Sequence, residues 1–175
     1  NLFNSAAVCM DGKVVYYCDK ILLPTYDIFD EDRYFSPGES PGVFNIKLDG
    51  KDRRIGIQIC EDLWDHDYEC KVTDLQKKKG AQIILIPAAF TVPTGIAHWE
   101  TLIRARAIEN SVFISATNMC GVHHSSRKTY GHSIFCDPWG KIVNKCSTKP
   151  KILNTIINLD MIEKVRKKIP SIYNS

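Results

Sequence analysis

The chain of 175 residues is long enough for one domain with a sizeable core, and its 44% hydrophobic and 25% charged residues are ordinary for a globular protein. The formal net charge of +3 is too small and too evenly spread to predict a nucleic-acid partner. No apolar run approaches the roughly 20 residues that span a bilayer, and the N-terminus has no signal-peptide pattern. We therefore expect one domain over residues 1–175, with no nucleic-acid or membrane partner.

In chain order, two short apolar runs over 5–10 and 14–18 flank Asp11-Gly12 and predict a β-hairpin, because Asp-Gly supplies the positive φ of a tight turn. Residues 20–43 are rich in Pro, Gly and acidic residues, which predicts a long ordered loop of the kind that usually carries function. Two further strands are expected around a second Asp-Gly turn, over 43–48 and 54–60.

The remainder of the chain alternates helical and strand patterns. The predicted helices cover residues 68–79, 97–110 and 161–168. The predicted strands cover residues 81–87, 112–117, 132–136, 141–146 and 153–159. This order indicates an α/β or α+β layered fold.

The seven cysteines are odd in number and form no C-x-x-C, which argues against a secreted disulfide framework and a zinc ribbon. Most lie in apolar surroundings, where Cys behaves as a small hydrophobic residue, and a reducing cytoplasm fits this usage. Adjacent His123 and His124 point to different sides, and no carboxylate spacing completes a metal site. We expect neither a metal nor another cofactor.

Three residues are candidates for chemistry. Cys60 closes an alternating strand just before a predicted helix, where a helix N-terminus and nearby cations favour the thiolate. Lys20 precedes the apolar run Ile-Leu-Leu-Pro, and a lysine buried in such a setting needs a partner. Glu31 lies where acidic and aromatic residues alternate. Taken alone, each has a plain structural alternative: a buried Cys, a surface Lys and a solvated acidic loop.

The segments around these residues form a series of ordered motifs. They are KILLPTY (20–26), FDEDRYFSPG (29–38), GIQICEDLW (56–64), FTVPTGIAHWE (90–100), RARAIEN (104–110) and YGHSIFCDPWG (130–140). The first three are particularly similar to the glutamine-hydrolysing domain of NAD synthetases, and the last three look like Nit-type amidases. Together they resemble the nitrilase superfamily of carbon-nitrogen hydrolases, from about Asn4 to about Pro170.

The resemblance implies an αββα sandwich and a Glu-Lys-Cys triad, with Cys60 as nucleophile, Lys20 as triad lysine and Glu31 as an additional carboxylate. The Cys60 thiolate would attack an amide or nitrile carbon, and the Lys20 ammonium and the Glu61 backbone N–H would stabilise the oxyanion. Water activated by a glutamate would then release the acid from the thioester. The implied partners are a small-molecule amide and further copies of the chain, in a dimer or higher homo-oligomer.

Two positions depart from the family pattern. The residue two before the triad lysine, usually Tyr, is Cys18 here, and we expect a change of packing there. The family's general-base Glu lies upstream, whereas no Glu precedes Lys20 in this sequence. We therefore expect this chain to be the C-terminal part of the domain, without its first β-α units. By itself it is expected to lack full activity.

Other residues are weaker candidates. Trp64, Phe90 and Asn118, with Trp99 and the two adjacent histidines, are expected either to line a pocket or to pack in the core. Arg104 and Arg106 with Glu109 predict an ion-pair network, because i, i+3 spacing places the last two on one helix face.

Three functions are compatible with these patterns: a stand-alone amidase, a glutaminase domain of an NAD synthetase, and a catalytically impaired homologue that binds or scaffolds. The second needs an attached synthetase domain with a Ser-Gly-Gly-x-Asp-Ser loop, which does not occur in this sequence. The third predicts that no amide forms a thioester on Cys60.

Overall fold

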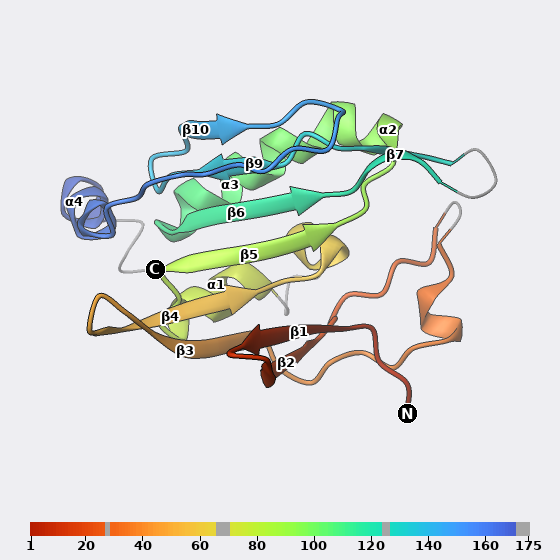
Figure 1. Ribbon diagram of the computed structural model, residues 1–175, viewed down its shortest axis with the longest axis horizontal. Coiled ribbons are helices and arrows are strands. Elements are labelled where there is room, and N and C mark those ends of the chain that lie inside the picture. The colour runs from red at the N-terminus through yellow and green to blue at the C-terminus, as the bar shows by residue number, and fades with distance from the viewer. Residues whose placement is uncertain (27–28, 66–70, 124–126, 171–175) are drawn as a thin grey trace.

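The computed structural model describes residues 1–26, 29–65, 71–123 and 127–170. Its centre is a mixed six-stranded sheet in the order β10-β9-β6-β5-β4-β3 (Figure 1). The strands are β3 (Gly42–Leu48), β4 (Lys51–Ile57), β5 (Ile83–Ala88), β6 (Phe113–Asn118), β9 (Ile134–Cys136) and β10 (Ile142–Lys145). Strands β4, β5 and β6 are parallel, and the outer pairs are antiparallel.

Both faces of this sheet are apolar, and each packs against a different layer. Ile84 and Ile86 of β5 are buried in a cluster with side chains of helix α3 (Glu100–Asn110), whereas Ile83 joins a cluster with Ile162 of helix α4 (Asp160–Lys168). This alternation follows from the two-residue period of a strand. Figure 1 shows α3 and helix α1 (Val72–Lys78) together behind the sheet.

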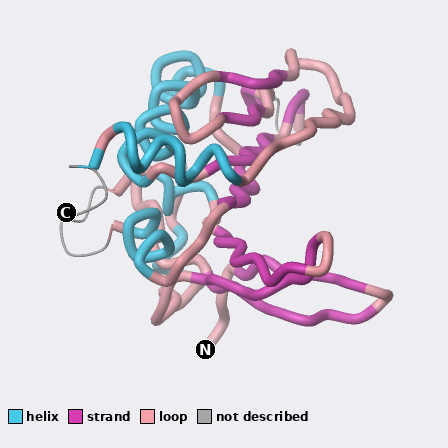
Figure 2. Tube along the Cα trace, turned by 90° about the vertical axis from the view of Figure 1, so that its left-hand side faces the viewer, coloured by secondary structure: helices cyan, strands magenta, loops and turns pink. Residues whose placement is uncertain are grey.

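A separate two-stranded sheet, β1 (Ser5–Met10) and β2 (Lys13–Asp19), extends beside β3 on the side away from α1 and α3 (Figure 2). Its turn has φ values of 49° at Asp11 and 73° at Gly12, and the β3–β4 turn repeats them with 51° at Asp49 and 72° at Gly50. Both predicted Asp-Gly hairpins are confirmed. The Tyr16 and Phe44 rings stack 5.6 Å apart, which ties the small sheet to the large one.

Helix boundaries differ from the sequence prediction in two places. Within the described residues α1 begins at Val72, and the predicted start at residue 68 lies outside them. The predicted helix over 97–110 is α3 preceded by a single π-helical turn, η3 (Gly95–Trp99), and by the short helix α2 (Val92–Thr94).

The predicted strand over 153–159 is wrong, because described residues 151–158 form no strand. Ile157 and Leu159 do pack against the cluster around Ile162, but Ile156 is 100% exposed. An alternating pattern buries one face, yet a strand also needs a neighbouring backbone to pair with. The short hairpin β7 (Cys120–Val122) and β8 (Lys128–Tyr130) was not predicted.

The layered α/β architecture predicted from the sequence is confirmed. In the part of the chain that the structure describes, no helix has the length and apolar character needed to cross a membrane.

Candidate active site

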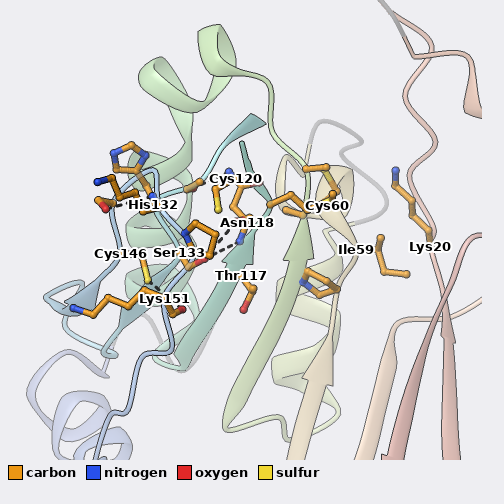
Figure 3. A pocket seen from close by; sticks show the side chains of 18 of the residues that line it. Lys20, Ile59, Cys60, Thr117, Asn118, Cys120, His132, Ser133, Cys146 and Lys151 are labelled. Carbon is orange, nitrogen blue, oxygen red and sulfur yellow. Dashed lines mark hydrogen bonds between the residues drawn. The ribbon is translucent and has the colours of Figure 1, made fainter. Parts of the chain in front are cut away.

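Three neighbouring parallel strands end at the same edge of the sheet, and the candidate residues follow them. Cys60 comes three residues after β4, Ala89 directly follows β5, and Asn118 closes β6. The carboxyl ends of parallel strands are the usual location of α/β binding sites. A cavity of about 530 Å³ opens here, and Figure 3 shows Cys60 between Lys20 on one side and Asn118 on the other.

Cys60 begins a tight 3-10 turn, η2 (Cys60–Leu63), and does not continue the strand as predicted. Strand β4 ends at Ile57. Ile59, the residue directly before Cys60, is still extended, with φ −118° and ψ 108°. Cys60 itself has φ 49°, a left-handed conformation that costs energy for a residue with a side chain. Such strain is characteristic of functional positions, and here it turns the chain abruptly at the thiol.

Burial raises the pKa of the Cys60 thiol above its ordinary value. The backbone N–H of Ala89 and the Lys20 ammonium lower this pKa, and the carboxylates of Glu61 and Glu31 raise it. Lys20 thus lowers the thiol pKa in the direction expected of a nearby cation, but desolvation is the largest effect and the pKa is raised overall. A thiol with a raised pKa is protonated near neutral pH and needs a base as it attacks.

Lys20 and Glu31 form an ion pair at the cavity wall. The Lys20 Nζ lies 2.6 Å from Glu31 Oε2, and the side chains are 2% and 19% exposed. The Lys20 backbone is fixed on both sides, because its N–H donates to Asn4 O at 2.8 Å and its carbonyl accepts from Gly38 N at 2.8 Å. The carboxylate comes from a 3-10 turn, η1 (Glu31–Arg33), in the long loop. Lys20, Glu31 and Cys60 all line the same cavity.

A second, water-sized cavity of about 20 Å³ adjoins Cys60. Its lining includes three of the predicted binding residues, Glu61, Trp64 and Phe90. Glu61 is 5% exposed, and its Oε2 accepts a hydrogen bond from the Tyr26 hydroxyl at 3.2 Å. The rings of Trp64 and Phe90 stack 5.7 Å apart with an angle of 7° between their planes. Cys60 thus lies between a large cavity and a narrow one.

Asn118 lines the large cavity, but its side chain is engaged with the wall. Its Oδ1 accepts from Phe90 N at 2.8 Å, and its Nδ2 donates to Gly131 O at 2.9 Å. Asn118 therefore joins the ends of β5 and β6 to the chain leading into β9, and shapes the cavity through these bonds.

The remaining sequence candidates do not gather here. Trp99 is fully buried in the core, with its indole N–H donating to His132 O at 2.9 Å. The His123 ring is hydrogen-bonded to Thr129 Oγ1 at 2.7 Å, and His124 lies outside the described residues.

Several cavity residues were not predicted from the sequence. They come from the connection between β6 and β9 and from the chain after β10, and include Met119 and, labelled in Figure 3, Cys120, His132, Ser133, Cys146 and Lys151. They are spread over more than 30 positions, and only His132 and Ser133 lie within one of the family motifs, YGHSIFCDPWG (130–140). For the others the only sequence signal is proximity to the ends of predicted strands, which alone does not select them.

Arg106 supports the turn that carries Cys60. Its guanidinium donates to Leu63 O at 3.1 Å and Trp64 O at 3.0 Å, and pairs with Asp65 at 2.8 Å. The predicted contact with Glu109 is confirmed at 2.9 Å. Arg104 was wrongly included in this network, because in the structure its Nε donates to Gly140 O at 2.8 Å.

Cys18, at the position where the family usually has Tyr, is buried against β3 and β4. Its thiol donates to Ile57 O at 3.4 Å, and its Sγ lies where a side chain on Gly42 would project. Burial raises the pKa of Cys18 to about 11, and that of Cys136 to about 12. Unlike Cys60, these thiols lie outside the large cavity.

Known proteins match almost the whole chain. Residues 1–167 match the carbon-nitrogen hydrolase family. The deaminated glutathione amidase of Mus musculus is 34% identical over 170 residues, which are 97% of this chain and 50% of that protein. The chain therefore spans about half the length of this curated relative.

Solved structures agree with this match. The NitFhit protein of Caenorhabditis elegans superposes with a TM-score of 0.84 at 30% identity, covering 99% of this chain and 42% of that one. A mutant amidase from Nesterenkonia sp. AN1, whose active-site cysteine has undergone Michael addition of acrylamide, superposes with a TM-score of 0.68 at 25% identity, covering 93% and 59%. The resemblance noted in the sequence is thus confirmed. The chain belongs to the carbon-nitrogen hydrolase family.

Proposed function

We propose that this chain carries the nucleophile and the oxyanion-stabilising lysine of an amidase that hydrolyses a small-molecule amide. The observation that carries the proposal is the convergence of Lys20, Glu31 and Cys60 on one cavity, with the lysine and glutamate 2.6 Å apart. Relatives named as amidases, and the adduct on the Nesterenkonia amidase cysteine, support the same chemistry.

In the proposed reaction, a general base takes the Cys60 proton while the sulfur forms a bond to the amide carbon. The carbonyl oxygen becomes an oxyanion, which the Lys20 ammonium and the Glu61 backbone N–H stabilise. Collapse of this intermediate breaks the carbon–nitrogen bond, and ammonia leaves with the transferred proton. Water then attacks the thioester, which releases the acid and restores the thiol.

By the family resemblance, the base in this scheme is a glutamate other than Glu31. Glu31 is a poor candidate, because its Oε2 is held 2.6 Å from Lys20 Nζ and is already engaged in that ion pair. Glu31 then serves to fix the ammonium that faces the oxyanion.

We also propose a cytoplasmic location and a homo-oligomer. The location rests on the free thiols of all six cysteines that the structure describes. The oligomer rests on the family resemblance, and size-exclusion chromatography with light scattering tests it.

An ammonia-release assay on the intact protein tests the proposed function. Cys60→Ala is expected to reduce hydrolysis of the best small amide by at least about 10³-fold, because no nucleophile remains. Cys120→Ala, which removes another thiol of the same cavity, is the matched control and retains activity. Equal activity of Cys60→Ala and the wild type would overturn the proposal.

A further inference from the structure

One buried carboxylate joins the two chain segments that carry Lys20 and Cys60. Asp62 is 1% exposed and belongs to the turn that Cys60 begins. Its Oδ1 accepts hydrogen bonds from Ile21 N at 3.1 Å and Leu22 N at 2.8 Å, the two residues that follow Lys20.

The other oxygen of the same carboxylate holds the nucleophile side. Asp62 Oδ2 accepts from Ile59 N at 2.9 Å, directly before Cys60, and the Asp62 N–H donates back to Ile59 O at 3.2 Å. These reciprocal bonds close the turn as a capping box closes the first turn of a helix. A single side chain therefore spans from the backbone beside the lysine to the backbone beside the thiol.

We propose that Asp62 is a positioning residue that sets the placement of Lys20 relative to Cys60, and that its three accepted N–H bonds are required for this reaction geometry. The proposal rests on the proposed function of these two residues. Asp62 is not among the residues that line either cavity, so its action passes through the backbone. A displacement of about 1 Å in a reacting group lowers rates by about 10²-fold.

The direction of the effect on the Cys60 thiol separates positioning from simple charge. The charged groups facing Cys60 are the Lys20 ammonium, which lowers the thiol pKa, and the Glu61 and Glu31 carboxylates, which raise it. Removing the Asp62 charge, which contacts the backbone N–H of Ile59, can only lower the thiol pKa or leave it unchanged if charge alone acts. Loss of the fixed position of Lys20 raises the thiol pKa, because the stabilising cation moves away from the sulfur.

The test compares three substitutions of Asp62 in the intact protein. Asp62→Asn keeps the shape but presents an NH₂ group to at least one backbone N–H, Asp62→Ala removes every acceptor, and Asp62→Glu keeps the charge and both oxygens. The matched control is Asp137→Asn. Asp137 is also buried, 5% exposed, and its Oδ1 accepts from Trp139 N and Lys141 N, both at 2.9 Å, in the turn between β9 and β10.

The readouts are the pH profile of Cys60 alkylation by iodoacetamide, followed by peptide mapping, and the steady-state constants for the best amide. We expect Asp62→Asn and Asp62→Ala to move the alkylation midpoint to higher pH and to reduce kcat by about 10- to 100-fold, with KM changed about twofold or less. Asp62→Glu is expected to lie closer to the wild type. Asp137→Asn is expected to lower the melting temperature without moving the midpoint.

Two results would overturn the proposal. One is an alkylation midpoint and a kcat in Asp62→Asn that equal those of Asp137→Asn, which would make the role of Asp62 purely structural. The other is a midpoint shifted to lower pH, which would mean that charge alone acts. Failure of the proposed function is seen separately, as wild-type protein that releases no ammonia from amides, and does not alter the alkylation comparison.

Discussion

Breaking the Lys20–Glu31 pair has a predictable cost, because the pair is almost inaccessible to water. Replacing Lys20 by Met removes the ammonium 2.6 Å from the Glu31 carboxylate, which is left only 19% exposed. Loss of one partner of a buried pair costs about 3–5 kcal/mol, and partial exposure of the glutamate favours the lower end, about 3 kcal/mol. Glu31→Gln also costs about 3 kcal/mol, because it leaves the 2%-exposed Lys20 ammonium without its counter-charge, although the amide oxygen still accepts a hydrogen bond. The double variant has no uncompensated charge, and we expect it to be about 2 kcal/mol more stable than the sum of the single effects predicts.

Urea denaturation of the intact protein, followed by circular dichroism, measures the four free energies of unfolding in this cycle. All four variants must give the same denaturant slope for the comparison to hold. Additivity within about 0.5 kcal/mol would show instead that the energies of the two charges do not depend on each other. The activity of Glu31→Gln gives a second measure, because a loosened ammonium lowers kcat more than it changes KM.

Two further predictions concern the scaffold. Burial raises the pKa of Asp65 to about 6 despite its contact with Arg106, so the folded state binds more protons than the unfolded state between about pH 4 and 6. The free energy of unfolding should fall by up to about 3 kcal/mol as pH rises through this window, and Asp65→Asn should remove that dependence; an unchanged pH profile in the variant would contradict it. Gly42→Ala places a methyl group against Cys18 Sγ and should cost about 1–3 kcal/mol. Adding Cys18→Ala should recover part of that loss in thermal melts, and no recovery would show that the strain lies elsewhere.

Much of the fold could be predicted from local chemistry. The two Asp-Gly turns adopt positive φ values, so both hairpins followed from the sequence, although the register shift between Val8 and Cys9 did not. The buried β-branched runs of β5 and β6 were likewise recognisable, because parallel central strands are apolar on both faces. These features depend on a few neighbouring residues, and each acts locally.

Features that depend on distant partners were not predictable. The segment containing Ile157 has the alternation of a strand, but whether it pairs depends on which backbone lies beside it. The raised pKa of Cys60 depends on how completely the folded chain excludes water from the thiol, which the strand-end pattern does not reveal. One sequence signal could have identified Asp62. It lies three positions after Ile59, the N-cap residue of the turn, where capping carboxylates occur.

The most direct test of the account is detection of an acyl group on Cys60. The intact protein is mixed with acetamide, quenched in acid during turnover and analysed by intact mass and peptide mapping. We expect a mass increase of one acetyl group on the peptide that contains Cys60, absent in Cys60→Ala and present in Cys120→Ala. Ammonia release with no acyl group on Cys60 in the quenched wild type, or an adduct that persists in Cys60→Ala, would contradict it.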